Sequence, residues 1–573
     1  MSDFEVKILN AAREAIRSVY DIEPDESILV VETPKDPKLG DYALSVAMKL
    51  SRTLRKNPME IAEPLVAKLY ELLPDVDTIT VARPGFINLR LKKDSLTAVI
   101  NKVIDAGDDY GKNDSGKGRR ILVEWVSANP TGDLHCGHAR NAAWGDCMCR
   151  LLEASGWDVL REFYVNDAGN QIEKFAKSLE ARYLQIIKGE DAVEFPEDGY
   201  HGDDIRELAR AFYDREGEKY LDCDQKTRHD ALARFGLDNN IPKMQRDLAR
   251  YGITYDQWFF ESSLHESGYV ADSVQALTDL GYTYEKDGAL WLNTSRILAE
   301  NLKKAGKSDA DIEKLGLKDD VLRRANGFYT YFAADIAYHR NKFAVRGFDK
   351  VINVWGADHH GHVARLKGAM DALGLDGEHR LDIVLMQLVK LVRDGEVVRM
   401  SKRTGKAISL TDLLDEIPVD ACRYFFNAKP ETQMEFDLGL AVREDSENPV
   451  YYVQYAHARI CTLLKALEAE GYTVPAAGEV DFSLLSGEAE QALIKKIAAY
   501  SQVVRLAARD YDPSHINRYL TELAGDFHRF YTACRIKGEE RPVLLARLKL
   551  ADTARSVLKN AMTLIGCTAP EKM

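Results

Sequence analysis

The sequence predicts a multidomain α/β plus all-α protein, built around a Rossmann-type domain with a doubly wound parallel sheet. Residues 121–126 are an apolar run, ended by a polar turn and followed by a helical pattern with a glycine at its start. The same strand–loop–helix order returns near residues 350–373, after a long charged stretch that indicates an insertion. Beyond about residue 445 only helical patterns remain, which predicts a helical bundle.

Length and composition narrow the class of protein. The 573 residues exceed what one hydrophobic core supports, and no run of 18 apolar residues predicts a membrane span. The first seven residues carry acids and no apolar stretch, so we expect no secretory signal. Eight scattered cysteines without a CxxC pair indicate a cytoplasmic protein with reduced thiols and no structural zinc. The net charge of −14 argues against nucleic acid as a partner, but only a local basic patch is needed to bind it.

Residues 1–112 are expected to form a separate α+β domain. Apolar residues recur at helical spacing in three segments, and two alternating segments joined through Pro84 and Gly85 predict paired strands. A polar, glycine-rich stretch then predicts a linker. The expected helices cover residues 4–19, 41–54 and 58–72, the strands residues 78–82 and 86–91, and the linker residues 107–118.

Residues 113–444 are expected to form the Rossmann domain. Two strand–loop–helix units come first, and charged helical stretches, including residues 203–220 and 226–237, then predict an insertion over about residues 189–320. After it, Tyr331, Asp335 and Tyr338 share one face of a predicted helix. Asp394 and Gly395 form a strong hairpin signal. The expected strands cover residues 121–126, 159–165, 350–355, 381–392 and 396–400, and the helices residues 137–154, 171–187, 329–339 and 362–373.

Residues 445–573 are expected to form an all-α bundle. Its four helical patterns cover residues 451–469, 488–508, 514–536 and 543–564. Near the start, Tyr451, Tyr455 and Arg459 could stack on or contact nucleic-acid bases. Aromatic side chains at that spacing are also typical of a bundle core, and the sequence leaves both interpretations open.

Two short segments carry a family resemblance. Residues 128–138 read ANPTGDLHCGH and residues 399–405 read RMSKRTG. Together they resemble the HIGH and KMSKS signatures of class I aminoacyl-tRNA synthetases, and the first is most similar to the arginyl family. Arg399 and Arg403 depart from the lysine and serine of the second consensus. The resemblance runs nearly end to end, with an N-terminal domain that contacts tRNA and a C-terminal anticodon-binding bundle.

This resemblance implies an arginine–tRNA ligase. The implied reaction joins L-arginine to tRNA(Arg) through arginyl-adenylate and releases AMP and diphosphate. It also implies that tRNA must be bound before activation becomes efficient, and that the enzyme is a monomer. ATP is the implied cosubstrate. Mg²⁺ should travel with the ATP phosphates, keeping most of its water, so no protein metal cage is expected.

The chemistry of activation explains the two signatures. The attacking carboxylate is an anion at pH 7, so the site needs alignment and charge compensation rather than a general base. His135 and His138 would therefore donate hydrogen bonds to the triphosphate, and Gly137 would let adenine lie flat on the backbone. Lys402 would meet the α- and β-phosphates. The other residues expected to shape the ATP site are Met400, Ser401 and Gly405.

Arginine recognition requires carboxylates that face a planar guanidinium. The Tyr-x-x-x-Asp pair of the family matches Tyr331 and Asp335, so Asp335 is the expected guanidinium partner. Asn129 would bind the α-amino or carboxylate end of the substrate, with help from Glu124. The residues expected to close the pocket are Asp358 and His359.

The same residues bear on other functions. Alternate side chains in residues 358–362 could hold zinc, but no cysteine or further ligand set supports a metal site. A cysteinyl-type class I synthetase is disfavoured by the missing cysteine–histidine spacing and by Asp335. A small-molecule nucleotidyltransferase has no reason to carry the helical bundle. A non-catalytic tRNA-binding paralogue would be free to lose His135, His138 and Lys402.

Overall fold

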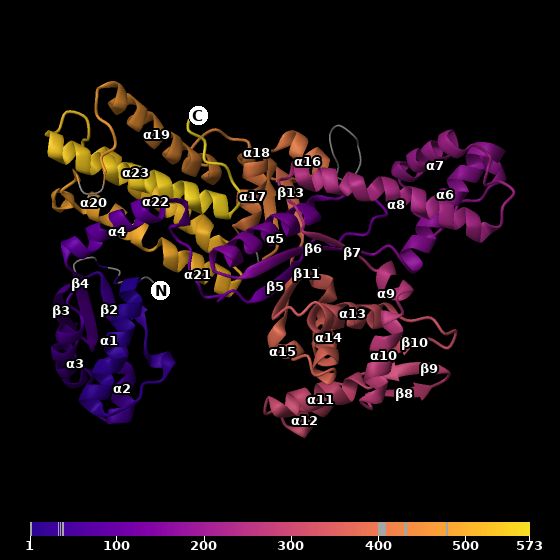
Figure 1. Cartoon of the computed structure of the whole chain (residues 1–573), viewed down its shortest axis with the longest axis horizontal. Helices are drawn as coiled ribbons and strands as arrows, with labels where there is room; N and C mark the ends of the chain where they lie inside the picture. Colours follow the sequence, from indigo (N-terminus) through magenta and orange to yellow (C-terminus); the bar gives the residue numbers. More distant parts are fainter. Residues whose placement is uncertain are drawn as a thin grey trace. The chain divides into compact units, whose positions relative to one another are not determined.

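The chain folds into two compact units (Figure 1). One unit comprises Asp114–Arg443, and the other combines Met1–Asn113 with Glu444–Met573. The computed structural model describes residues 3–32, 34, 36, 39–398, 408–428, 432–476 and 479–573.

A five-stranded parallel sheet forms the centre of the first unit. Its order is β12-β11-β5-β6-β7, and every pair of neighbours is parallel. In chain order this is the 3-2-1-4-5 arrangement of a doubly wound sheet, which reverses direction between β5 and β11. The predicted fold class is therefore confirmed. The strands are β5 (Arg120–Glu124), β6 (Asp158–Val165), β7 (Gln257–Phe260), β11 (Lys350–Gly356) and β12 (Leu381–Met386).

The predicted strand–loop–helix unit at residues 121–154 is present. Strand β5 ends at Glu124, and helix α5 (Cys136–Ala154) follows after a loop. Helix α5 packs closely on Trp125, because a Cβ at Gly145 would overlap the indole. Only glycine fits there, and this contact helps to fix the start of the helix relative to the sheet.

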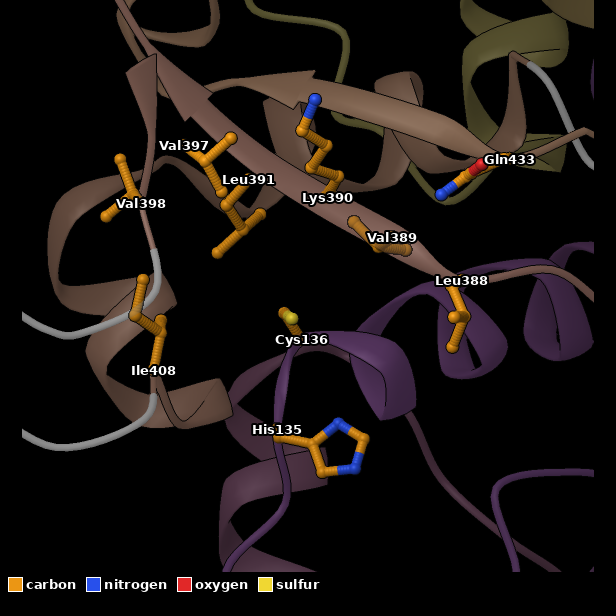
Figure 2. A pocket seen from close by; sticks show the side chains of 10 residues that line it. All are labelled: His135, Cys136, Leu388, Val389, Lys390, Leu391, Val397, Val398, Ile408 and Gln433. Carbon is orange, nitrogen blue, oxygen red and sulfur yellow. The ribbon is translucent and has the colours of Figure 1, made fainter.

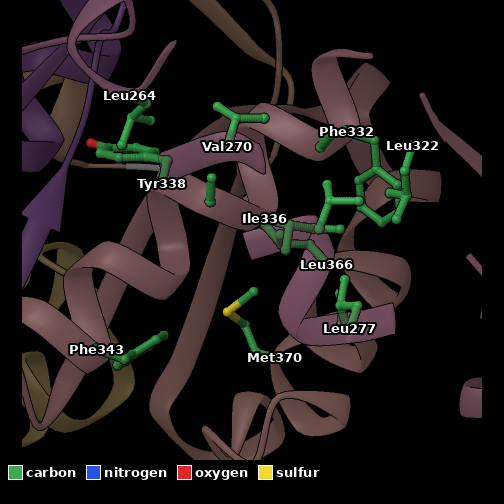
Figure 3. Close-up of a cluster of buried hydrophobic side chains, with 14 of the residues drawn as sticks. Leu264, Val270, Leu277, Leu322, Phe332, Ile336, Tyr338, Phe343, Leu366 and Met370 are labelled. Atoms are coloured by element: carbon green, nitrogen blue, oxygen red, sulfur yellow. The ribbon is translucent and has the colours of Figure 1, made fainter. Parts of the chain in front are cut away.

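Three helices share one hydrophobic core with Leu122 of β5 and Val351 of β11 (Figure 3). It joins α10 (Tyr269–Asp279), α13 (Tyr331–Arg340) and α14 (His360–Ala372). A five-residue π-helix, Asn341–Val345, continues α13 directly. The side chains drawn in Figure 3 include Val270, Leu277, Ile336, Leu366 and Met370.

The segment expected as one insertion, residues 189–320, contains a strand of the central sheet and is therefore divided into two parts. Helices α6 (Asn170–Lys188), α7 (Asp203–Glu216) and α8 (Gln225–Arg250) pack together as a helical arm (Figure 1). Strand β7 then returns to the central sheet, inside the range 189–320, since Trp258 and Phe259 pair beside β6. A small antiparallel sheet follows, made of β8 (Thr283–Lys286), β9 (Ala289–Leu292) and β10 (Asp320–Arg323).

The expected strand over residues 381–392 is wrong, because it is two strands. Strand β12 ends at Met386, and β13 (Val389–Arg393) belongs to another sheet with β14 (Glu396–Val397) and β15 (Met434–Asp437). The break allows the chain to leave the central sheet at Gln387 and Leu388. The hairpin at Asp394 and Gly395 is confirmed, with both residues at positive φ.

The remaining helices of this unit are short. They are α9 (Ser262–Glu266), α11 (Thr294–Lys304), α12 (Asp309–Glu313), α15 (Gly377–Arg380), α16 (Leu410–Glu416), α17 (Val419–Asn427) and α18 (Leu438–Ala441).

The N-terminal part of the second unit has a four-stranded sheet, β1-β2-β4-β3, where two strands were expected. Helix α2 begins at Val46, because Tyr42–Leu44 pairs with β4 as strand β2 instead of starting the helix at residue 41. The elements are α1 (Asp3–Tyr20), β1 (Val31–Glu32), β2 (Tyr42–Leu44), α2 (Val46–Leu54), α3 (Pro58–Leu72), β3 (Val76–Ala82), β4 (Phe86–Leu91) and α4 (Lys93–Ala106).

The C-terminal part is the expected helical bundle. The helix predicted over residues 488–508 divides at Ala499, and this lets Tyr500 stack on Tyr519 with ring centroids 5.3 Å apart. The bundle helices are α19 (Pro449–Ala469), α20 (Glu488–Ala498), α21 (Tyr500–Asp510), α22 (Ser514–Ala533) and α23 (Arg541–Leu564).

None of the described helices combines the length and apolar character that crossing a bilayer requires.

Candidate active site

The loop of residues 125–135 lies at the switch point of the sheet, where ligands bind in doubly wound folds. It follows the carboxyl end of β5, whose last residue Glu124 is in register with Asn353 of β11. The loop leads into the start of α5, where backbone N–H groups are free to meet a negative charge. The motif predicted from the sequence therefore occupies the ligand-binding edge of the sheet.

The backbone is strained where it leaves the sheet. Val126 has φ +66° and Ser127 has φ +39°, a region that a β-branched residue rarely adopts. Three hydrogen bonds hold the turn. The Val126 N–H donates to Oδ1 of Asn141 at 2.8 Å, and Ser127 Oγ donates to Glu124 at 3.0 Å and accepts from the Tyr164 N–H at 3.1 Å. The strain is thus stabilised by the surrounding side chains.

His135 and His138 cap helix α5 reciprocally. The N–H of Gly137 donates to Nδ1 of His135, and the N–H of His135 donates to Nδ1 of His138, both at 3.1 Å. An Nδ1 that accepts a hydrogen bond carries no proton, so the proton of each neutral ring is on Nε2. Each imidazole therefore keeps one N–H donor available for a ligand.

The two rings are held neutral. Their centroids are 3.8 Å apart and the rings are stacked. Burial, together with the neighbouring His135, lowers the pKa of His138 to about 3, and burial also lowers the pKa of His135. Gly137 favours this arrangement, because a Cβ there would lie 3.0 Å from the His135 ring and would require the ring to shift.

A pocket of about 510 Å³ opens beside His135 (Figure 2). Its other walls are mostly aliphatic, and the side chain of Lys390 points away to form an ion pair with Glu435. The lining residues are His135, Cys136, Leu388, Val389, Lys390, Leu391, Val397, Val398, Ile408 and Gln433.

The described residues on either side of the second signature line this pocket. Val398 and Ile408 both line it, and Ser409 forms a backbone bridge with His135. The N–H of Leu410 donates to the carbonyl of Leu134 at 2.7 Å. The residues Met400, Ser401, Lys402 and Gly405 lie outside the described residues, so their predicted roles stay predictions.

A fully buried arginine ties helix α5 to another wall of the pocket. Arg140 donates to the carbonyls of Gln387 and Thr432, each at 2.8 Å, and to the carbonyl of Leu388 at 3.3 Å. These carbonyls lie just before β13 and β15. The helix that begins with the histidines is therefore fixed to the strands that form the opposite wall.

Tyr331 and Asp335 lie one turn apart on α13, as expected from their spacing. The Tyr331 side chain is 44% exposed, and its hydroxyl accepts a hydrogen bond from the Asn170 N–H at 3.1 Å. Asp335 is half-buried and accepts a hydrogen bond from Nε2 of His362 at 3.0 Å. Arg365 contacts the other ring nitrogen of His362 at 3.1 Å.

A second carboxylate near Asp335 was not predicted from the sequence. Glu261 follows β7, is buried, and accepts a hydrogen bond from the Tyr164 hydroxyl at 2.8 Å. Burial and the charge of Asp335 raise the pKa of Glu261, although Tyr164 and His265 act in the opposite direction. The only sequence signal was an acid directly after an apolar run, within a segment expected to be an insertion.

Glu124 is buried and already has two partners within the protein, which the sequence did not indicate. Its carboxylate pairs with the buried Lys342 at 2.6 Å and accepts from Ser127. On the neighbouring strand Glu162, in register with Glu124, pairs with Arg346 at 2.5 Å. Lys342 belongs to the π-helix and Arg346 directly follows it, so two buried carboxylates are neutralised from one segment.

Three residues that were predicted to contact arginine are exposed to solvent. Asn129 is exposed in the loop before α5. Asp358 and His359 are exposed just after β11, with 3.6 Å between Oδ2 of Asp358 and Nε2 of His359. His362, which the sequence suggested only as a metal ligand, is the residue of this segment that contacts Asp335.

Among the residues that the structure describes, no group of three His, Cys, Asp or Glu side chains is arranged to hold a metal ion.

The tyrosines predicted to contact bases lie on α19 in the other unit. Tyr451 and Tyr455 have nearly parallel rings 6.2 Å apart, and Tyr455 is 41% exposed. The Arg459 guanidinium lies over the Tyr531 ring at 4.3 Å. The exposed ring of Tyr455 offers a face on which a base could stack.

Comparisons with known proteins cover almost the whole chain. The model of the class I (R) tRNA synthetase catalytic domain matches residues 99–437, the arginyl tRNA synthetase N-terminal domain matches residues 7–91, and the DALR anticodon-binding domain matches residues 453–573. The Arginine–tRNA ligase of Ruminiclostridium cellulolyticum is 49% identical over 95% of this chain and 94% of its own. That of Caldanaerobacter subterraneus is 48% identical over 100% and 98%. The fold is similar to that of Thermus thermophilus arginyl-tRNA synthetase, with a TM-score of 0.76 and 21% identity over 99% of this chain and 100% of that one.

Proposed function

The chain belongs to the arginyl-tRNA synthetase family and ligates L-arginine to tRNA with ATP, and from this premise we propose which residues carry each step. In the first step an oxygen of the arginine carboxylate bonds to the α-phosphorus of ATP, and the bond to the bridging oxygen breaks to release diphosphate. In the second step a terminal ribose hydroxyl of tRNA attacks the arginyl-adenylate and releases AMP. Matches over nearly the full length of arginine–tRNA ligases disfavour a cysteinyl-type enzyme or a non-catalytic paralogue.

His135 and His138 bind the triphosphate as neutral donors. The observation that carries this proposal is the reciprocal cap, because it leaves the Nε2–H of each ring for a phosphate oxygen. A hydrogen bond aimed at a developing charge stabilises a transition state without reorganising the site. Neutral rings also avoid a strong ionic bond to the departing diphosphate.

Lys402 supplies a positive charge to the α- and β-phosphates, with Met400, Ser401 and Gly405 shaping its loop. Lys402 is four residues beyond Val398, so an extended chain brings it within about 14 Å of that residue. The bridge between His135 and Ser409 supports the proposal, since the far end of the same segment is joined to the histidine motif. Adenine suits the aliphatic pocket next to Gly137, where the backbone offers a flat surface.

Arginine binds between α13 and the ends of the central strands. Asp335 pairs with the guanidinium, Tyr331 borders it, and Glu261 adds a second negative charge close to Asp335. Bidentate pairing with a carboxylate favours the planar guanidinium over the ammonium of lysine. Asn129 and Glu124 hold the α-amino or carboxylate end. Residues expected to close the pocket remain Asp358 and His359.

Mg²⁺ accompanies ATP and would neutralise part of the charge on its phosphate oxygens. The donor set supports binding through ATP rather than by a protein cage, since the two histidines present N–H groups and not lone pairs.

The tRNA contacts span the whole chain in this proposal. The predicted boundaries at residues 112 and 444 delimit the catalytic domain. The N-terminal domain before it and the helical bundle after it both bind tRNA(Arg). Tyr451, Tyr455 and Arg459 contact bases, and bound tRNA is required for efficient activation. The enzyme acts as a monomer in the cytoplasm, and its eight free cysteines support a reducing compartment.

ATP–diphosphate exchange tests the proposed function most directly. The purified chain is assayed with each of the twenty amino acids, with and without tRNA. We expect exchange with arginine alone, stimulated by tRNA, and formation of arginyl-tRNA. Exchange with another amino acid, or an intact protein that charges no tRNA, would contradict the proposal.

The variant Lys402→Ala tests the role of the lysine. A charge needed mainly in the transition state should affect rate more than substrate affinity, so we expect kcat to fall about a hundredfold with the KM for ATP nearly unchanged. Steady-state kinetics measures both values. An equal loss of both would mean that Lys402 binds ground-state ATP instead.

A further inference from the structure

A second pocket, of about 560 Å³, lies in the helical arm of the catalytic unit. Residues of α6 and α7 at helical spacing face it, and the loop after α6 completes it. The lining carries three arginines against two glutamates. Its residues are Arg182, Gln185, Ile186, Gly189, Glu190, Arg206, Glu207 and Arg210.

The positive charge of this pocket is only partly compensated. Arg206 pairs with Glu190 at 2.8 Å, whereas the described structure gives Arg182 and Arg210 no carboxylate at ion-pair distance. Arg182 lies over the Phe195 ring at 4.1 Å and donates to Gln185 at 2.7 Å, but its Nε is enclosed without an acceptor. Burial and the nearby Arg206 lower the pKa of Arg182, although Glu190 and Asp203 act in the opposite direction, and a bound anion would stabilise the charged guanidinium.

The pocket lies along the helix whose first residue contacts Tyr331. Helix α6 begins at Asn170, whose N–H donates to the Tyr331 hydroxyl. Arg182 is twelve residues further along the same helix, which corresponds to about 18 Å at 1.5 Å per residue. The 3′ end of tRNA must enter the active site, so the paired stem that precedes it lies a few nucleotides away.

We propose that Arg182, Arg206 and Arg210 bind a phosphate group in the backbone of the tRNA acceptor arm. This inference rests on the proposed function. Arginine suits it because the guanidinium fork matches two phosphate oxygens, and three such groups surround one cavity. The contact carries no sequence information and sets the position of the acceptor arm relative to Tyr331 and Asp335.

Charge removal at the exposed Arg210 tests the proposal in the full-length enzyme. For Arg210→Gln we expect the KM for tRNA to rise about fivefold and the KM values for ATP and arginine to stay unchanged. The slope of log affinity against log salt should fall by about one for each phosphate that the variant no longer neutralises. The matched control is Lys226→Gln, which removes one charge from the exposed surface of α8 in the same arm. It should leave all these values unchanged.

Two isolated RNA hairpins locate the contact. Affinity for a hairpin of the acceptor-arm sequence should fall in Arg210→Gln, and affinity for an anticodon-arm hairpin should not. Calorimetry with inorganic phosphate tests the alternative that the pocket binds free phosphate and not the phosphate of an RNA backbone. Phosphate binding that Arg210→Gln abolishes, with the KM for tRNA unchanged, would overturn the RNA assignment in favour of a free-phosphate site.

The inference can fail independently of the proposed function. If Arg210→Gln and the double variant Arg206→Gln/Arg210→Gln both charge tRNA with an unaltered KM, the pocket makes no contact with RNA and the ligase assignment stands. If the unmodified chain charges no tRNA, the proposed function itself fails.

Discussion

The two ends of the proposed active site hold their functional groups by different means. At the histidine end, His135 and His138 are oriented by backbone N–H groups at the start of α5. At the carboxylate end, Asp335 and Glu261 are oriented by other side chains, His362 and Tyr164. Groups fixed by the backbone depend on a short local sequence, whereas groups fixed by side chains depend on segments far apart in the chain.

Substitutions at the two ends should therefore have different consequences. A change at the histidine end should alter rate and leave the fold intact, because the capping bonds stabilise only the first turn of one helix. A change at the carboxylate end leaves His362 or Tyr164 without its hydrogen-bond partner and alters the charge next to the remaining carboxylate, so binding, stability and pH dependence should respond together.

The largest effect is expected from Asp335→Asn. Removing the charge that we propose pairs with the guanidinium should lower kcat/KM for arginine about a thousandfold, or about 4 kcal/mol, with the KM for ATP almost unchanged. Steady-state diphosphate exchange over a range of arginine concentrations measures this. A reduction below tenfold would mean that Asp335 does not touch the guanidinium.

Lys342→Met should have the next largest effect, on stability. It leaves Glu124 buried without its cation, so we expect the free energy of unfolding to fall by about 3 kcal/mol. Denaturant unfolding followed by fluorescence measures the decrease. The double variant Glu124→Gln/Lys342→Met should recover part of it, since it removes both charges. A double variant as unstable as the sum of the two single variants would show that the pair is not coupled.

At the histidine end we expect His138→Asn to lower kcat about a hundredfold, or about 2.7 kcal/mol, by removing one donor to the phosphates. The melting temperature should change little. His379→Asn is a suitable control, because His379 is exposed near Lys350 at the amino end of β11. Both proteins are compared by exchange kinetics and thermal melting. Unfolding of His138→Asn would show that the cap also supports the fold.

The smallest effect should appear in the pH profile. Because the pKa of Glu261 is raised, its carboxylate is lost first as the pH falls, and arginine, which favours the charged form, should then bind more weakly by up to about tenfold per pH unit. Glu261→Gln should move this acid limb to lower pH, and Glu266→Gln should leave it in place. Titration of kcat/KM for arginine measures the limb. His138, with a pKa of about 3, should contribute no limb near neutrality.

The predictable parts of the molecule were those specified by short segments. The switch from an apolar run to a polar turn and then to a helix located β5, α5 and both histidines, because local hydrophobic pattern and capping chemistry determine them. The alternation of strands and helices also predicted the doubly wound sheet. The bundle followed from helical periodicity in the same way.

The missed features depend on tertiary contacts. Val126 would not be placed at positive φ from sequence, since a β-branched residue adopts it only when neighbours such as Asn141 hold the turn. Glu261 gave no motif, and its position becomes clear only when β7 pairs beside β6. The split after Met386 likewise depends on β15, which lies far later in the chain and gives β13 its partner.

The bridge between His135 and Ser409 also joins the starts of two helices. His135 caps α5 and Ser409 caps α16, and beside the bridge the Leu410 N–H donates to the carbonyl of Leu134. A substitution that displaces the start of α16 should therefore displace the two histidines as well, although it lies far from them in the sequence.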